Sequence, residues 1–206
     1  MEEALVAKGS DYCVPYRRRN EGKTDYKARR AFVVSGKPRL VVRHTLNNVT
    51  AQIVTAKPNG DEVLVSAHSR ELNNYEWRFS GGNIPSAYLT GLLCGVKAKA
   101  KGVEEVILDI GLRSPSKGAR VFAVLKGVLD AGVTVPHSEE KLPDQDRIEG
   151  KHIAQYAESL ASTPETYQSK FSKYLKQNLS PEGLPKAFVE AKKEIMASAE
   201  SGGAKK

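Results

Sequence analysis

A dense cluster of basic side chains lies near the N-terminus, in the stretch Tyr16–Arg30 with the sequence YRRRNEGKTDYKARR. Seven of its fifteen residues are arginine or lysine, and only Glu21 and Asp25 oppose them. Guanidinium groups hold phosphate oxygens through two parallel hydrogen bonds, and ammonium groups bind them as point charges. The cluster therefore predicts binding to a polyanion, and nucleic acid is the first candidate.

The distribution of charge along the 206 residues supports this prediction. Residues 17–43 contain ten basic and two acidic residues, which accounts for the whole net charge of +8. Folded surfaces normally intersperse the two signs. The alternative is a solvated helix in which Arg17 pairs with Glu21 and Asp25 pairs with Arg29 at i,i+4 spacing. That alternative leaves five basic residues of the cluster without a partner.

The composition of the cluster favours RNA, although charge alone does not separate RNA from DNA. Tyr16 and Tyr26 have rings that could stack on unpaired bases, with core packing as the alternative. Gly22 and Thr24 suit a chain that lies close to a folded RNA backbone. The candidate RNA-binding residues are Tyr16, Arg17, Arg18, Arg19, Lys23, Thr24, Tyr26, Lys27, Arg29, Arg30, Lys37, Arg39 and Arg43.

Signatures of catalysis are sparse. The segment His137–Glu140 lacks the HExxH spacing that places two histidines on one zinc ion, so we expect a loop there. Asp109 ends an apolar run, where enzymes often carry a carboxylate, but Glu104 and Glu105 lie at the other end of that run. Gly81-Gly82-Asn83 is not a dinucleotide fingerprint, although it could contact a phosphate. We expect no enzymatic activity, no cofactor, no bound metal and no small-molecule substrate.

Two rival functions remain open at this point. A metal-dependent RNA-processing nuclease would need Asp109 and would lose magnesium-dependent turnover when Asp109 is replaced by asparagine. A DNA-compacting protein would bind duplex DNA as tightly as RNA.

The composition, 40% hydrophobic and 27% charged, is typical of a globular protein. Cys13 and Cys94 fit neither a metal-ligand spacing nor a disulfide framework, so we expect reduced thiols, with a single disulfide as the alternative. No run of about twenty apolar residues is present, which predicts no membrane span. The start of the sequence lacks a basic segment followed by an apolar stretch, so we expect no secretory signal.

Three runs rich in β-branched residues predict an antiparallel meander: residues 39–45, 49–56 and 61–69, with Val63 and Val65 on one face. The turn signals between these runs are Asn47-Asn48 and Pro58-Asn59-Gly60-Asp61. The pattern then changes to alternating helices and strands: a helix over 83–102, a strand over 104–111 covered on both faces, a helix over 117–132 and a short strand over 133–136. Gly91 and Gly95 lie one turn apart, which would allow the first helix to approach the sheet closely.

The predicted fold class is α/β, with a mixed sheet built from an antiparallel meander followed by βαβαβ and flanked by helices. We divide the chain into a basic N-terminal RNA-binding arm (1–36), an α/β core domain (37–140) and a helical C-terminal extension with a loose end (141–206). In the extension, Ser162–Glu165 and Ser180–Glu182 predict helix starts. Apolar residues recur at helical spacing after the second start, at Leu184, Phe188, Ala191 and Ile195.

Several stretches between about residue 12 and about residue 155 match a known family in order. They are YRRRNEGKTDYKARR (16–30), KPRLVVR (37–43), AQIV (51–54), the GD, VL, SAHS and EL elements of 60–72, AYLTGLL (87–93), LDIGL (108–112), ARVFAVLKG (119–127) and the DAGV and PHSE elements of 130–139. Together they resemble the large-subunit ribosomal protein family that binds 5S ribosomal RNA, in its long archaeal and eukaryotic form. The length and the helical tail are similar to the archaeal form.

The resemblance implies a mixed sheet with helices, an N-terminal RNA-binding arm and no enzymatic activity. It implies a structural role in the large subunit of the cytoplasmic ribosome, with 5S ribosomal RNA, large-subunit ribosomal RNA and neighbouring ribosomal proteins as partners, and no membrane. The arm motif of the family falls on Arg17, Arg18, Arg19, Lys23, Thr24, Tyr26, Arg29 and Arg30. The sequence departs from the family at Asn20, where a basic residue is usual, at HTLNN (44–48) and at YEWRFSGGN (75–83).

Overall fold

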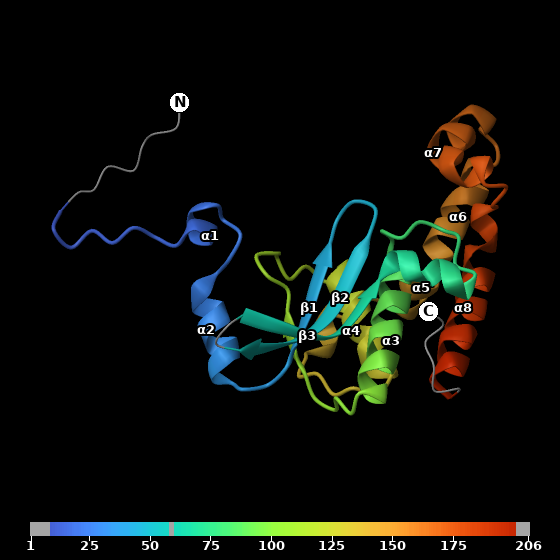
Figure 1. The fold of residues 1–206 in the computed structure, drawn as a ribbon. Helices are drawn as coiled ribbons and strands as arrows, with labels where there is room; N and C mark the ends of the chain where they lie inside the picture. The colour runs from blue at the N-terminus through green and yellow to red at the C-terminus, as the bar shows by residue number, and fades with distance from the viewer. Residues whose placement is uncertain (1–8, 58–59, 201–206) are drawn as a thin grey trace.

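A four-stranded mixed sheet with the strand order β3-β2-β1-β4 forms the centre of the molecule (Figure 1). Its strands are β1 (Arg39–His44), β2 (Val49–Lys57), β3 (Gly60–His68) and β4 (Ile107–Asp109). The computed structural model describes residues 9–57 and 60–200. Pro58 and Asn59 of the predicted turn and the predicted loose end SGGAKK lie outside the described residues.

The pairing of the strands confirms the predicted meander and the parallel return. β1 pairs with β2 and β2 with β3 in antiparallel fashion, whereas β1 pairs with β4 in parallel, with Arg39 opposite Ile107. Successive side chains of a strand point to opposite faces. Leu40 and Val42 of β1 are therefore buried on one face, and Arg39 and Arg43 project from the other.

The prediction that Val63 and Val65 lie on one face of the third strand was wrong. A β-bulge interrupts the register between β2 and β3, so that Ile53 lies opposite Val65 while Val54 lies opposite Val63. A bulge inserts one extra residue and breaks the alternation of faces. Val65 is consequently buried at 4% exposure, whereas Val63 is 49% exposed.

Helices α3 (Ile84–Ala100) and α4 (Arg120–Asp130) form the layer that covers the apolar face of the sheet. Helix α3 begins where predicted because the side chain of Asn83 accepts a hydrogen bond from the backbone N–H of Ser86 at 2.9 Å. The fully buried side chains shared by the sheet and these helices include Leu40, Ile53, Leu89, Leu92, Leu93 and Leu125.

Gly91 and Gly95 allow a close approach, but their partner is helix α4 and not the sheet as predicted. A Cβ atom added at Gly91 would lie 2.1 Å from the carbonyl oxygen of Val124, and one at Gly95 would lie 2.5 Å from Cβ of Ala131. Gly127 of α4 makes the matching close approach to α3, since a Cβ atom added there would lie 2.2 Å from the carbonyl oxygen of Tyr88. The small residues thus bring two helix backbones together, a contact that the spacing alone does not assign to a partner.

The second half of the sheet is smaller than predicted. β4 spans three residues at the sheet edge, and Ile107 and Leu108 are only half-buried, so the strand is not covered on both faces. The run 133–136 forms an isolated parallel bridge between Thr134 and Glu105. Val133 and Val135 are buried, which explains the apolar pattern by core packing without a further strand.

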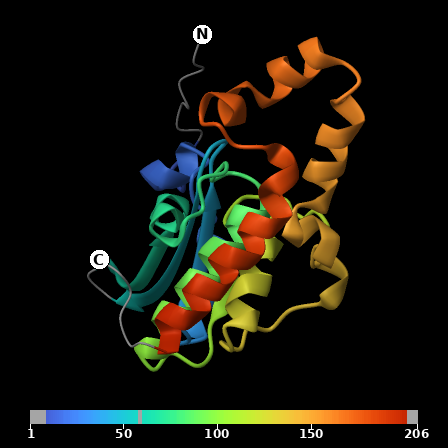
Figure 2. The ribbon, with the colours of Figure 1, turned by 90° about the vertical axis from the view of Figure 1, so that its right-hand side faces the viewer.

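The C-terminal extension is helical, as predicted, and its last helix packs on the core (Figure 2). Its elements are α5 (Gln145–Glu149), α6 (Lys151–Leu160), α7 (Pro164–Lys176) and α8 (Leu184–Glu200). The described residues also form the short 3-10 helices η1 (Ser69–Tyr75), η2 (Glu139–Lys141) and η3 (Pro181–Gly183). All four apolar residues predicted on one face of α8 are buried, and Phe188 contacts Tyr88 of α3 with ring centroids 5.5 Å apart.

The N-terminal segment forms α1 (Arg17–Asn20) and α2 (Tyr26–Val34), on the other side of the sheet from α8 (Figure 1). Neither helix contains a buried residue, so neither contributes to the core. The exact domain boundaries remain a prediction. Cys13 and Cys94 are both free thiols. None of the helices in the described part of the chain has the length and apolar character of a membrane span.

Candidate nucleic-acid interface

The first arginines of the basic cluster lie on the single turn of α1. Successive residues of an α-helix are about 100° apart around its axis, so Arg17, Arg18 and Arg19 project in different directions. All three are exposed. Arg17 approaches Glu21 at 3.5 Å in a pair whose arginine side chain is 84% exposed, and Nε of Arg18 donates to Oγ1 of Thr24 at 2.9 Å. The turn thus presents its guanidinium groups to solvent.

The second part of the cluster lies on α2, which starts at a well-defined cap. Gly22 has a φ of +60° and allows the chain to reverse between the two helices. The carboxylate of Asp25 then accepts hydrogen bonds from the backbone N–H groups of Lys27 at 2.9 Å and Ala28 at 3.2 Å. The predicted i,i+4 pair between Asp25 and Arg29 does not form, because Asp25 caps the helix and Arg29 contacts the sheet.

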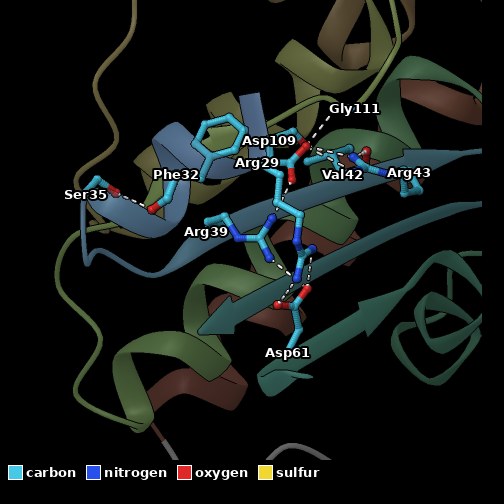
Figure 3. A network of polar contacts seen from close by, with 9 residues as sticks. All are labelled: Arg29, Phe32, Ser35, Arg39, Val42, Arg43, Asp61, Asp109 and Gly111. Carbon is cyan, nitrogen blue, oxygen red and sulfur yellow. Dashed lines mark hydrogen bonds and ion pairs between the residues drawn. The ribbon is translucent and has the colours of Figure 1, made fainter. Parts of the chain in front are cut away.

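Arg29 attaches α2 to the sheet. Its two terminal nitrogens donate to the two carboxylate oxygens of Asp61 on β3, at 3.0 and 2.8 Å, in the bidentate geometry that arginine and carboxylate favour (Figure 3). The hydrogen bond from Arg29 is the main reason that the pKa of Asp61 lies below its ordinary value. Both side chains therefore remain charged at neutral pH, and the arm is held against the body.

The ion pair continues across the sheet face as a network of alternating charges (Figure 3). Arg39 donates to Asp61 at 2.8 Å and to Asp109 at 3.1 Å, and Arg43 donates to Asp109 at 3.1 Å. Asp109 also accepts the backbone N–H of Gly111 at 2.8 Å. Arg39 and Asp109 are buried, with 4% and 6% exposure. The network fixes the strand ends on which the arm rests.

An open groove of about 780 Å³ runs between the arm and this face of the sheet. The arm contributes Arg18, Lys23 and Tyr26 to its lining, and the sheet contributes Arg43 and Gln52, among others. We call this feature the arm groove. Basic side chains outnumber acidic ones in its lining, so the groove suits a negatively charged ligand.

Four cations of the cluster have no carboxylate partner among the described residues: Arg18, Arg19, Lys27 and Arg30. All four are exposed. The other three do have acidic partners, since Arg17 and Lys23 share Glu21, and Arg29 binds Asp61. The sequence predicted five unpaired cations, and the difference arises because Lys23 contacts Glu21 at 2.8 Å.

The remaining predicted site residues fall into two groups. Tyr16 is 71% exposed and lies against Tyr26 with ring centroids 4.9 Å apart, so neither ring packs in the core. The second group lies before or on β1, and each member has a carboxylate partner. Lys37 pairs with Glu105, and Arg43 pairs with Asp109. Arg39 pairs with both Asp61 and Asp109. Arg43 is half exposed, whereas Arg39 presents almost no surface.

Asp61 is the residue that sequence reasoning missed, because the sequence placed it only in a turn and at the start of a strand, with no functional role. It lies 32 positions from Arg29, and no local pattern marks a pair at that separation. The one available signal was an unassigned carboxylate at the start of a strand that follows a basic arm.

The catalytic candidates do not converge. The carboxylate of Asp109 is bonded to Arg39, Arg43 and the backbone N–H of Gly111. The described residues contain no group of three or more His, Cys, Asp and Glu side chains that could hold a metal ion. Nδ1 of His137 lies 2.7 Å from the carbonyl oxygen of Val135, in the predicted loop that leads into η2.

Comparison with protein families gives a match that covers most of the arm, the sheet, α3 and α4. The family model described as "Ribosomal large subunit proteins 60S L5, and 50S L18" matches residues 10–104 and 96–138, which is more than half of the chain. The matched region contains the arm groove and the ion-pair network, and it ends before α5. The chain therefore belongs to the family of large-subunit ribosomal proteins that comprises 60S L5 and 50S L18.

Proposed function

We propose that the chain binds 5S ribosomal RNA through the exposed face of its arm and helps to dock that RNA onto the large-subunit ribosomal RNA. Membership of the family makes the chain an RNA-binding component of the large ribosomal subunit, in the cytoplasm, with ribosomal RNA and neighbouring ribosomal proteins as partners. Beyond family membership, we propose that this RNA is 5S ribosomal RNA and that the chain has no enzymatic activity.

The observation that carries the proposal is the group of four exposed arm cations without a carboxylate partner, defined above. Like charges this close repel one another in the free protein, and a polyanion that neutralises them releases its condensed counterions. The same four residues contribute nothing to the core, since α1 and α2 contain no buried residue. Their positive charge is therefore available to bind a polyanion and is not needed to pack the core.

The form of the arm favours RNA with unpaired bases over a DNA duplex. Side chains cannot read the deep major groove of an A-form helix, so specific RNA recognition uses phosphates, shape and looped bases. The exposed ring of Tyr16, supported from one side by Tyr26, is a platform on which such a base can stack.

The contacts divide between binding and support. We assign RNA contact to the arm and to two basic residues beyond it, Lys37 and Arg43, of which Arg43 lines the arm groove. The assigned arm residues are Tyr16, Arg17, Arg18, Arg19, Lys23, Thr24, Tyr26, Lys27 and Arg30. Arg29 and Arg39 support the arm through Asp61, and the burial of Arg39 leaves it too little surface to contact RNA directly.

The proposal is tested by comparing the affinity of the full-length chain for 5S ribosomal RNA, a transfer RNA and a DNA duplex of similar length across a salt series. If six to eight phosphates are neutralised, the affinity for 5S ribosomal RNA falls about a thousandfold between roughly 50 and 200 mM salt. We expect the preference for 5S ribosomal RNA to survive at about 150 mM salt. Equal binding to all three ligands would contradict specific recognition, and equal binding to the duplex would favour the DNA-compacting alternative.

A further inference from the structure

A second basic pocket lies beside the start of α4, outside the arm. It has a volume of about 520 Å³, and its lining includes His44, Leu112, Arg113, Ser114, Ser116 and Arg120. We call it the α4 pocket. No aspartate or glutamate contributes to its lining within the described residues. Its electrostatic character is therefore set by two arginines, a histidine and hydroxyl groups.

The two arginines of the α4 pocket are not neutralised within the described structure. Neither Arg113 nor Arg120 has a carboxylate within 4.0 Å among the described residues. Arg120 donates through Nη1 to the carbonyl oxygens of Thr45 at 2.8 Å and Gly82 at 2.9 Å, which leaves its Nη2 and Nε groups without a bonded partner in the described residues. The backbone thus fixes one edge of the guanidinium and leaves donors on the other.

The electrostatic effect of this arrangement is visible in the neighbouring groups. Burial and the charge of Arg113 lower the pKa of Arg120 below its ordinary value. Burial, Arg120 and Arg113 together lower the pKa of His44, and the buried Nδ1 of His44 has no hydrogen-bond partner in the described residues. Burial is the largest cause of both shifts, and the smaller contribution of the arginines reflects a positive potential that also favours a bound anion.

The start of α4 adds backbone donors to the same place. Ala119 occupies the N-cap position and has no side chain that can accept a hydrogen bond from the first turn. The first bonded amides of the helix are those of Phe122 and Ala123, so the N–H groups of Arg120 and Val121 have no partner among the described residues. Free N–H groups and the helix dipole favour an anion at this point.

The α4 pocket adjoins the arm groove. Leu112 lines both, and the guanidinium of Arg43 in the arm groove lies against Gly111, one residue before Leu112. Arg113, Ser114 and Ser116 are exposed, so the pocket opens to the surface and can receive a phosphate that belongs to a polymer. A nucleic-acid strand that leaves the arm groove past Leu112 reaches this pocket next.

We propose that the α4 pocket binds a backbone phosphate of ribosomal RNA, as a second anchor in addition to the arm. The phosphate is held by Arg113, Arg120 and the free N–H groups at the start of α4, with the hydroxyls of Ser114 and Ser116 at its rim. The inference rests on the proposed function, because it takes ribosomal RNA to be the polymer that the arm groove holds. The phosphate belongs either to 5S ribosomal RNA or to large-subunit ribosomal RNA, which the experiment separates.

The test uses the full-length chain with Arg113→Gln, since Arg113 is exposed and makes no bond that supports the fold. A first assay measures binding to 5S ribosomal RNA alone, and a second assay measures binding of the preformed protein–5S complex to large-subunit ribosomal RNA. In the assay whose RNA supplies the phosphate, we expect the slope of log affinity against log salt to decrease by about 0.7–0.9. The affinity at ~150 mM salt should fall about fivefold in that assay. Arg70→Gln is the matched control, because Arg70 is an exposed arginine that lines neither the arm groove nor the α4 pocket.

An unchanged slope and affinity in both assays would overturn the α4 pocket as a phosphate site. A loss for Arg70→Gln as large as that for Arg113→Gln would overturn it equally, because the effect would then follow net charge. The proposed function fails separately, if alanine substitution of Arg17, Arg18 and Arg19 also leaves binding to 5S ribosomal RNA unchanged.

Discussion

Replacing Arg17, Arg18 and Arg19 together with alanine is expected to lower the affinity for 5S ribosomal RNA about a hundredfold at ~150 mM salt, if each arginine neutralises one phosphate. The slope of log affinity against log salt should decrease by about 2–3 for the same reason. The melting temperature should change little, because α1 contains no buried residue and its ion pair between Arg17 and Glu21 is exposed. The measurements are a filter-binding titration across salt and a thermal melt.

A matched control removes the same charge elsewhere. Lys170, Lys173 and Lys176 are exposed on α7, and their replacement by alanine also removes three positive charges. This variant should bind 5S ribosomal RNA nearly as the unaltered chain does. An equal loss in both variants would mean that net charge alone sets the affinity. A large fall in the melting temperature of the arginine variant would show that the arm belongs to the core.

Replacing Asp109 with alanine is expected to lower the free energy of unfolding by about 3–5 kcal/mol, the usual result of removing one partner of a buried ion pair. Arg39, at 4% exposure, would lose one of its two carboxylates, and Arg43 and the N–H of Gly111 would lose the same acceptor. Urea denaturation measures the difference. Retention of full stability would show that the network is dispensable for the fold.

Glu105→Ala provides the comparison for Asp109→Ala. Glu105 lies just before the same strand and pairs with Lys37, but both side chains are more than 40% exposed. An exposed pair of this kind contributes less than about 1 kcal/mol. A similar loss of stability in the two variants would contradict the assignment of the buried network as the structural one.

Asp109→Asn separates the structural role of Asp109 from catalysis. A metal-dependent nuclease would cleave RNA in the presence of magnesium and lose this activity in the variant. The structure favours a structural role, because three donors already bond the carboxylate. We therefore expect no magnesium-dependent cleavage of RNA by either protein, and turnover by the unaltered chain would refute the non-enzymatic role.

The elements of the fold were largely predictable because their signals are local. The β-branched runs predicted the meander and the pattern of residues 83–102 predicted α3, which the structure confirms. Three details were not predictable for physical reasons. A bulge changes the face of Val63 without a sequence signal, small residues at Gly91 and Gly95 do not reveal their partner, and a buried run at 133–136 looks alike in a strand and in a packed loop.

The positive charge of the candidate site was predictable from the sequence, but the ion pairs that hold the arm against the sheet were not. The density of arginine and lysine in residues 16–30 is a property of the sequence alone. The contact between Arg29 and Asp61 depends on where the folded sheet places β3, and it competes with the local pair to Asp25 that the spacing suggested. The α4 pocket combines residues of three separate segments, around His44, Arg113 and Arg120, so no single sequence motif predicts it.

The most direct test of the central claim is ultraviolet cross-linking of the full-length chain to 5S ribosomal RNA, followed by mass spectrometry of the linked peptides. The account predicts that peptides from residues 16–30 cross-link, with the exposed Tyr16 as a leading site. Cross-links confined to α6, α7 and α8, with none in the arm, would contradict it.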